Sequence, residues 1–314
     1  MDAVNGPTSQ ASAAGLNLAE AVRKTLRRLQ DDFKRCPVAY RHFWRRAKEL
    51  GGSVPESLFL NPLSTPVFLF PWWVEQSLSP SPDIEFQSEL MYSSINLLYY
   101  VRLLDDAMDR HCNSPELLPV LTFLHSRFQG GFQTLFSGRS RFWEYFYELI
   151  DRTTEVTIED LSLKDVGFGE FMRLAAQKSC AAIIPIAAVI CRYNRHEEFD
   201  KWSEMWTAFS TWNQMRDDVM DWHRDLSNGT ATYLLSEAAK RKTPEEDIPH
   251  WMLREGFDWS VEVLDQLATK ATELASRIKV PEMQSDLSAR YARVASELRF
   301  VSATLGRIAT IGSG

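Results

Sequence analysis

The sequence predicts an all-α protein organised as a single domain, and three observations lead to that prediction. Apolar residues recur every three or four positions in several long segments, which is the period of an amphipathic helix. Two of these segments, residues 84–110 and 200–226, contain neither proline nor glycine. No stretch shows sustained alternation of apolar and polar residues closed by Asn-Gly or Asp-Gly turns, which is the pattern of hairpin strands.

The predicted elements follow in order along the chain. Residues 1–15 are rich in Gly, Ser, Ala and Pro and predict a disordered tail, so the domain is expected to span residues 16–314. The first helix is predicted from an apolar stripe at helical spacing: Leu18, Val22, Leu26, Leu29 and Phe33. Helix breakers cluster in residues 51–84 and predict a long irregular link. The last helix is expected after Pro281, on a second stripe: Leu287, Tyr291, Val294, Leu298, Val301 and Leu305.

Composition narrows the class of partner. The net charge of -7 and the pI near 5.5 argue against nucleic acid as the main partner, but not against a phosphorylated ligand held through a metal. The first 15 residues show no secretory signal, and the most apolar window, residues 180–191, is too short to span a membrane. We therefore expect a cytoplasmic protein with a small-molecule substrate.

Three aspartates interrupt the first of the two long helical segments. Asp105 and Asp109 are one turn apart and share a face, while Asp106 lies to one side. The neighbouring residues Leu103 and Leu104 are apolar, which argues against a simple solvated acidic face. Like charges at this spacing destabilise an isolated helix, so a role in stability is not expected.

The second long segment carries a similar cluster. Asp217, Asp221 and Asp225 repeat every four residues and share a face, and Asp218 flanks them four residues after Gln214. Carboxylate oxygens at this spacing suit Mg²⁺, which prefers to share the phosphate oxygens of a substrate. Two such clusters facing each other across a helical bundle would clamp a diphosphate between metal ions. An EF-hand calcium site is excluded, because its loop pattern is missing.

Both clusters resemble motifs of a known superfamily. The run "LLDDAMD" resembles the first aspartate-rich motif, DDxxD, of class I isoprenoid (terpene) synthases. The run "QMRDDVMDWHRDLSNGTATY" resembles the second aspartate-rich motif of the trans-prenyltransferases. Between them, residues 172–194 resemble the prenyltransferase helix in which a lysine precedes a small residue and an apolar run. The resemblance covers residues 85–235 and implies a class I terpenoid synthase helical bundle with a central active-site cavity.

Roles follow position by position from the resemblance. It implies that the first cluster binds two Mg²⁺ ions and the second binds a third, with Lys178 reaching the diphosphate directly. The expected metal ligands are Asp105, Asp106, Asp109, Asp217, Asp218 and Asp221. Arg224, Asn213 and Tyr233 are further candidates for contact with the substrate or its phosphates. The less favoured alternative for Lys178 is a surface lysine whose ammonium extends to solvent.

Two departures from the elongating prenyltransferases favour a cyclase. Gly51 and Gly52 are followed by Ser53 and Val54 where the elongating enzymes carry basic residues, and only Arg110 follows the first motif. A site for one diphosphate instead of two predicts a terpene cyclase that acts on farnesyl diphosphate. The signature that bacterial and plant cyclases carry in the second motif is also absent. By lacking both this signature and the basic residues of the elongating enzymes, the chain resembles fungal sesquiterpene cyclases of the humulene synthase type.

Other functions stay open. A chain-elongating or head-to-head prenyltransferase is the main alternative, and a non-catalytic regulatory subunit is a third class that intact metal motifs disfavour. A homodimer is also left open.

Aromatic residues predict the length of the substrate. Tyr99 and Tyr100 lie one to two turns before Asp105, where their rings would close the cavity beneath a fifteen-carbon chain. Phe209, on the second segment, is another candidate for the cavity wall. For any single aromatic residue, packing in the core is the simpler explanation.

Overall fold

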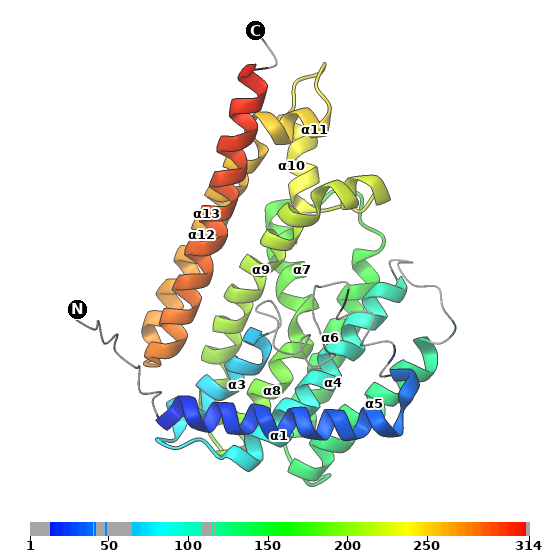
Figure 1. Cartoon of the computed structure of the whole chain (residues 1–314), viewed down its shortest axis with the longest axis vertical. Helices are drawn as coiled ribbons and strands as arrows, with labels where there is room; N and C mark the ends of the chain where they lie inside the picture. The colour runs from blue at the N-terminus through cyan, green and yellow to red at the C-terminus, as the bar shows by residue number, and fades with distance from the viewer. Residues whose placement is uncertain are drawn as a thin grey trace, which may run out of the picture. The chain divides into compact units, whose positions relative to one another are not determined.

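The computed structural model describes residues 13–39, 41, 48, 65–108, 115 and 117–311, and every regular element among them is a helix (Figure 1). The all-α prediction is therefore confirmed. The helices are α1 (Ala13–Arg35), α3 (Thr65–Leu78), α4 (Ile84–Met108), α5 (Leu117–Leu135), α6 (Phe142–Asp160), α7 (Phe168–Lys178), α8 (Ile184–Arg192), α9 (Phe199–Asn228), α10 (Tyr233–Arg241), α11 (Ile248–Trp251), α12 (Phe257–Arg277) and α13 (Pro281–Ile311). Short 3₁₀ turns precede α8 and α9, and one π-helical turn joins α11 to α12.

The chain divides into two compact units. Unit 1 comprises Met1–Trp143 with Cys191–Tyr193, and unit 2 comprises Glu144–Ile190 with Asn194–Gly314. Helix α1 begins at Ala13, inside the range predicted as a tail, and the residues before it lie outside the described part of the chain. The single domain predicted for residues 16–314 stays a prediction.

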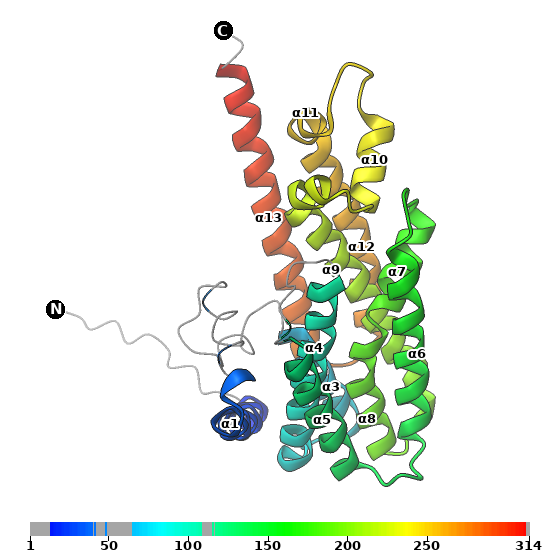
Figure 2. The ribbon, with the colours of Figure 1, turned by 90° about the vertical axis from the view of Figure 1, so that its right-hand side faces the viewer.

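Unit 1 is organised around α4, which packs against both α1 and α5 (Figures 1 and 2). The predicted stripe on α1 supplies the contact: Leu29 and Phe33 are buried, and Leu26 is partly buried beside them. From α4, Tyr92, Ile95 and Leu103 enter the same apolar cluster. The helical period therefore assigned the buried face of α1 correctly.

Helix α3 corrects the prediction of an irregular link over residues 51–84, of which residues 51–64 lie outside the described part. Thr65–Leu78 is helical although Pro71 lies inside it. A proline removes one backbone donor and ordinarily interrupts a helix. Here the segment buries Phe70, Trp72 and Trp73, so the apolar surface removed from water outweighs the lost hydrogen bond. The carbonyl of Pro71 accepts a hydrogen bond from Gln87 Nε2 at 3.3 Å.

A buried carboxylate connects α3 to a distant part of unit 1. Glu75 is fully buried and accepts hydrogen bonds from Gln87 Nε2 at 2.5 Å, the Tyr193 hydroxyl at 2.6 Å and the Asp83 backbone N–H at 3.0 Å. Burial, and then the bond to Glu75, raise the pKa of Tyr193 to about 12, which keeps its hydroxyl protonated as the donor. The short segment Cys191–Tyr193 is thereby attached to unit 1.

Unit 2 is organised around α9, against which α7, α10 and α12 pack. Helices α12 and α13 run side by side in opposite directions (Figures 1 and 2), and α13 begins at Pro281 as predicted. Gly229 ends α9 in the left-handed region, with φ of 69°, where glycine carries no steric penalty. Thr232 then caps α10 by accepting the Leu235 N–H at 3.2 Å.

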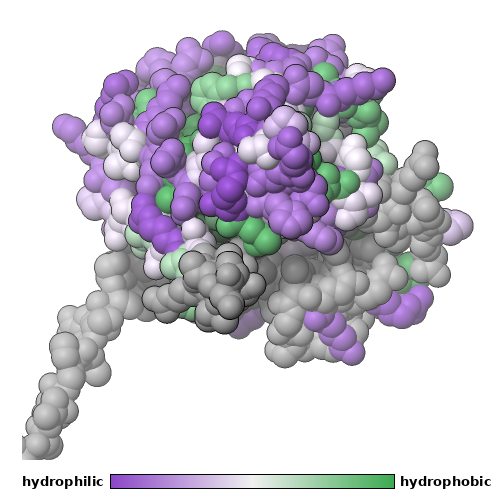
Figure 3. All heavy atoms as spheres, turned by 90° about the horizontal axis from the view of Figure 1, so that it is seen from above, coloured by the Kyte–Doolittle hydropathy of each residue, from purple (hydrophilic) through white to green (hydrophobic). Residues whose placement is uncertain are grey.

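Apolar surface is largely enclosed. Within the described residues no single helix is long and apolar enough to cross a membrane; α7 and the segment Cys180–Arg192 reach that length only as a pair bent by 48°. Ile184–Ile190 of this pair is buried in the protein. The face that carries α10 and α11 is mostly hydrophilic, with separate apolar spots (Figure 3).

Two adjacent glycines of α5 give a test of this packing. A Cβ at Gly131 would lie 2.0 Å from Ser93 Oγ and 3.2 Å from Ser93 Cβ, whereas one at Gly130 would meet no atom within 4 Å. We expect Gly130→Ala to raise the free energy of unfolding by about 0.5–1 kcal/mol, because alanine restricts the unfolded chain. Gly131→Ala should lower it by about 1–3 kcal/mol through overpacking. Denaturant unfolding of the two variants measures both effects, and equal shifts would contradict the α4–α5 packing.

Candidate active site

The second aspartate motif lies on the buried side of α9. The helix buries a stripe of large side chains: Trp202, Met205, Trp206, Phe209, Trp212, Met215 and Val219. Asp218 belongs to the same face and is only 4% exposed. Asp217 and Asp221, in contrast, keep about two-fifths of their side chains exposed, at 41% and 43%. Asp218, which was expected to flank the shared aspartate face, is therefore the buried aspartate of the motif.

Asp218 has a neutral partner. Gln214 Nε2 donates a hydrogen bond to Asp218 Oδ1 at 2.8 Å, and among the described residues no ion pair to this carboxylate is found. Burial raises the pKa of Asp218 to about 8; the Gln214 hydrogen bond opposes this rise, and the charges of Asp225 and Asp217 add to it. A buried carboxylate with an elevated pKa is a feature of functional sites.

The other two aspartates of the motif are occupied by neighbours on α9. Asn213 Nδ2 donates to Asp217 Oδ2 at 3.0 Å, and Arg216 forms an ion pair with the same carboxylate. Arg224 pairs with Asp221 at the exposed end of the motif. Within the described residues, no three acidic, histidine or cysteine side chains converge as a metal-binding group. The structure thus brings Asn213 to Asp217 and Arg224 to Asp221, but does not cluster the three carboxylates.

Lys178 ends α7, near the buried aspartate. Its ammonium lies 2.5 Å from Asp160 Oδ2 on α6, and its positive charge opposes a small part of the rise in the pKa of Asp218 that burial causes. The end of α7 is fixed against α9, because Trp206 Nε1 donates to the Ser179 carbonyl at 3.2 Å. Asp160 was missed from the sequence, since nothing in its local pattern marks it as the partner of a lysine 18 residues later.

The predicted aromatic residues of unit 2 are packed in the interior. Phe209 is 5% exposed, with its ring centroid 5.6 Å from that of Trp206. Tyr233 stacks on Phe171 at 5.2 Å and also contacts Trp259 at 5.5 Å. Burial raises the pKa of the Tyr233 hydroxyl. Trp259 was not selected from the sequence, because only the fold brings α12 next to α10.

The first aspartate motif belongs to unit 1 and is described in part. Asp105 is exposed in the last turns of α4, Asp106 follows it on that helix, and Asp109 lies outside the described residues. Tyr99 is 8% exposed within the apolar cluster of unit 1. Tyr100 is half-buried and contacts α5, with its ring 5.3 Å from Phe128. Both tyrosines therefore have packing partners, and contact with a substrate stays a prediction.

The buried carboxylate of Asp218 leads to a stability prediction. Burial raises the pKa of Asp218 in the folded chain from its ordinary value of 3.8 to about 8. The protein should therefore lose stability as the pH rises from 3.8 towards 8, because the unfolded chain releases this proton first. Asp218→Asn keeps an acceptor for Gln214 without the charge. We expect its melting temperature at neutral pH, in chelator, to be about 2–6 °C above wild type, a gain that shrinks towards pH 4. Thermal unfolding across this range tests it; a variant less stable than wild type at every pH would contradict the assignment.

Comparison with known proteins places the fold. No family model matches the sequence, and no curated protein matches it. Among solved structures, a geranylgeranyl pyrophosphate synthetase from the archaeon Geoglobus acetivorans is 13% identical, with a TM-score of 0.64 over 91% of this chain and 99% of its own. The corresponding synthetase from Pyrococcus horikoshii Ot3 is 15% identical, with a TM-score of 0.54 over 82% and 98% of the two chains. The chain therefore has the all-helical isoprenoid synthase fold.

Proposed function

We propose that this protein is a Mg²⁺-dependent enzyme of the prenyltransferase type, which acts on an allylic diphosphate. The observation that carries the proposal is the buried Asp218, which lies in the second aspartate motif and lacks a cationic partner of its own among the described residues. The shared fold supports it, because both similar structures are geranylgeranyl pyrophosphate synthetases. This support favours the prenyltransferase alternative over the cyclase that the sequence departures suggested.

The donor set fits the proposed metal. Asp105, Asp217 and Asp218 offer hard carboxylate oxygens, which Mg²⁺ prefers over nitrogen or sulfur ligands. The charge of Asp218 is unfavourable in its buried site, and a bound cation would make the ionised form favourable. When bound, Mg²⁺ would neutralise the charge that develops on a departing diphosphate.

The side chains of unit 2 have complementary tasks in this proposal. Lys178 presents three N–H donors, so it can hold Asp160 and still donate to a diphosphate oxygen. Asp160 fixes the direction of the ammonium before substrate arrives, which lowers the cost of organising the site. Arg224 is 56% exposed beside Asp221 and would exchange that weak surface pair for a phosphate.

A cyclase is the second candidate, and the departures from the elongating pattern favour it. Residues 53 and 54 after the Gly pair are not basic, and a single arginine follows the first motif. A second diphosphate would then find fewer cationic donors. In this case the chain would convert farnesyl diphosphate alone into a sesquiterpene, like the fungal enzymes of the humulene synthase type.

One incubation series distinguishes the two candidates. The purified protein is supplied with geranyl, farnesyl or geranylgeranyl diphosphate and Mg²⁺, with and without isopentenyl diphosphate. A prenyltransferase gives longer diphosphates only when both substrates are present, whereas a cyclase gives a hydrocarbon from the allylic substrate alone. We expect chelation to abolish turnover and Asp105→Asn to lower it at least about 100-fold, while the circular dichroism spectrum is unchanged. Full activity in chelator would exclude the metal-dependent mechanism.

The ring of Tyr100 leads to a prediction about chain length. If this ring closes the substrate cavity beneath a fifteen-carbon chain, the protein should have a higher kcat/KM for farnesyl diphosphate than for geranylgeranyl diphosphate. Tyr100→Ala should then shift the preference at least about 10-fold towards the longer chain. Phe128→Ala is the matched control, because it removes the ring that contacts Tyr100 on α5. Loss of stability without a change in preference, seen alike in both variants, would mean that Tyr100 only packs.

A further inference from the structure

A polar cavity in unit 1 lies away from the aspartates of α4. It has a volume of about 330 Å³ and is lined by residues of α1, α4 and α5, among them three arginines: Arg28, Arg35 and Arg127. Tyr92, one of its lining residues, precedes Asp105 by 13 residues on α4, which corresponds to roughly 20 Å along the helix. The cavity is therefore separate from the first aspartate motif.

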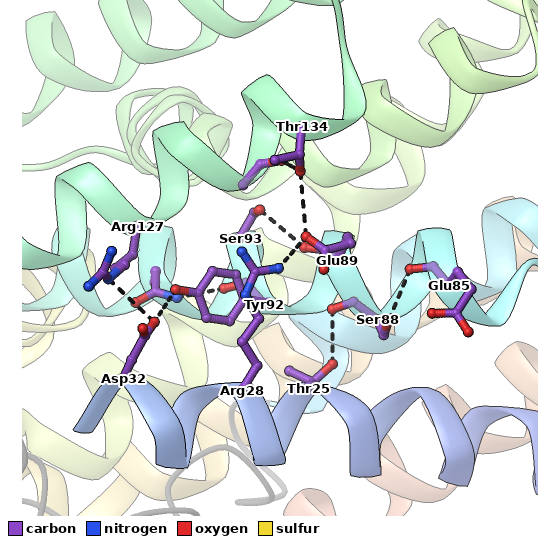
Figure 4. A network of polar contacts seen from close by, with 12 residues as sticks. Thr25, Arg28, Asp32, Glu85, Ser88, Glu89, Tyr92, Ser93, Arg127 and Thr134 are labelled. Carbon is purple, nitrogen blue, oxygen red and sulfur yellow. Dashed lines mark hydrogen bonds and ion pairs between the residues drawn. The ribbon is translucent and has the colours of Figure 1, made fainter. Parts of the chain in front are cut away.

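The carboxylate that enters this cavity already has its partners (Figure 4). Asp32 is 7% exposed and accepts a hydrogen bond from the Tyr92 hydroxyl, and Arg127 Nε lies 3.3 Å from its Oδ2. Burial, and then the contact with Asp32, hold the pKa of Tyr92 well above its usual range, so the hydroxyl remains a donor. The other acidic lining residue, Asp31, pairs with Lys34 at 2.8 Å.

The arginines retain donors that these pairs do not use. Arg28 is held in place because its guanidinium lies 3.7 Å above the Tyr92 ring and pairs with Glu89 (Figure 4). Arg127 uses one edge for Asp32, and in the described part of the chain its terminal nitrogens have no protein acceptor. Arg35 has no ion pair to any described residue. Each guanidinium carries five N–H donors in a planar fork, so several donors can reach a ligand in the cavity.

The local charge favours an anion. At the cavity, Arg28, Lys34, Arg35 and Arg127 carry four positive charges against the three carboxylates Asp31, Asp32 and Glu89, which leaves an excess of one positive charge. The C-terminal end of α1 contributes a partial negative charge of about half a unit, which offsets only part of this excess. The lining is polar, with charged residues, Ser126 and two glycines, and it offers no apolar wall for a hydrocarbon chain.

We propose that this cavity binds a small phosphate-bearing anion, inorganic phosphate or diphosphate. Tetrahedral phosphate oxygens match guanidinium forks in a two-point contact, and Arg28 and Arg127 are already fixed by Tyr92 and Asp32. A hydrophilic ligand of this size fits the volume, whereas a prenyl chain does not fit the polar lining. The assignment is independent of the proposed function, because it uses none of the aspartate motifs.

Calorimetric titration of phosphate and of diphosphate into the full chain tests the site, with chelator present so that the aspartate motifs hold no metal. Arg35→Gln removes the exposed guanidinium at the cavity, and Arg27→Gln removes an exposed guanidinium of α1 that does not line it. We expect Arg35→Gln to weaken binding at least about 10-fold and Arg27→Gln to leave it within about twofold. Thermal unfolding checks that both variants fold as the wild type does.

Each possible result of the titration either supports or overturns the proposed anion site. Saturable binding that depends on Arg35 supports the site, and the tighter of the two anions identifies its ligand. No saturable binding to the wild type, equal loss in both arginine variants, or full displacement by chloride at the same ionic strength would overturn the proposal. A failure here would leave the prenyltransferase assay unaffected, since that assay depends on metal and allylic substrate.

Discussion

The burial of one carboxylate on α9 is the constraint on which unit 2 depends. The helix buries an almost continuous apolar face, and Asp218 lies within it. Removing a carboxylate from water costs several kcal/mol when no cation compensates it. The large aromatic residues on the same face each contribute about 1.5–3 kcal/mol on burial. Their packing against α7, α10 and α12 can therefore offset the desolvation cost of Asp218. Stability and chemistry are therefore combined in one helix face.

The two polar regions of the protein differ in the sign of their charge. The aspartate motifs gather carboxylates that need cations, whereas the cavity formed by α1, α4 and α5 gathers guanidinium groups that need anions. Helix α4 contributes to both, with Tyr92 towards one end and Asp105 towards the other. Both regions use a neighbouring side chain to fix a charged group, Gln214 for one carboxylate and the buried Tyr92 ring for one guanidinium. In each case the position of the charge is set before a ligand binds.

Periodicity was sufficient to predict the four helices α1, α4, α9 and α13, but not what surrounds them. The apolar stripes of α1 and α13 and the absence of breakers in α4 and α9 identified those elements, because burial of one face follows the helical repeat. Helix α3 was missed because Pro71 is a local signal, while the burial that overrides it is a tertiary effect.

The candidate site was predictable in composition and less so in geometry. Aspartates at fixed spacing are visible in the sequence. Which of them is buried depends on the face that α9 turns towards α7 and α12, and in the structure that face carries Asp218 and not Asp217. The pairing of Asp32 with Tyr92 and Arg127 joins three helices. No pattern within one segment could reveal it.

The hydrogen bond from Tyr193 to Glu75 has a consequence for the order of folding. Residues 191–193 belong to unit 1, although more than 40 residues of unit 2 precede them in the chain. An N-terminal piece that ends at Trp143 would keep the Gln87 and Asp83 donors of the buried Glu75 but would lack the third donor, the Tyr193 hydroxyl. During synthesis, unit 1 can acquire its helices early but can close this contact only after residue 193 has left the ribosome. The first unit to begin folding is thus completed only when the second is well under way.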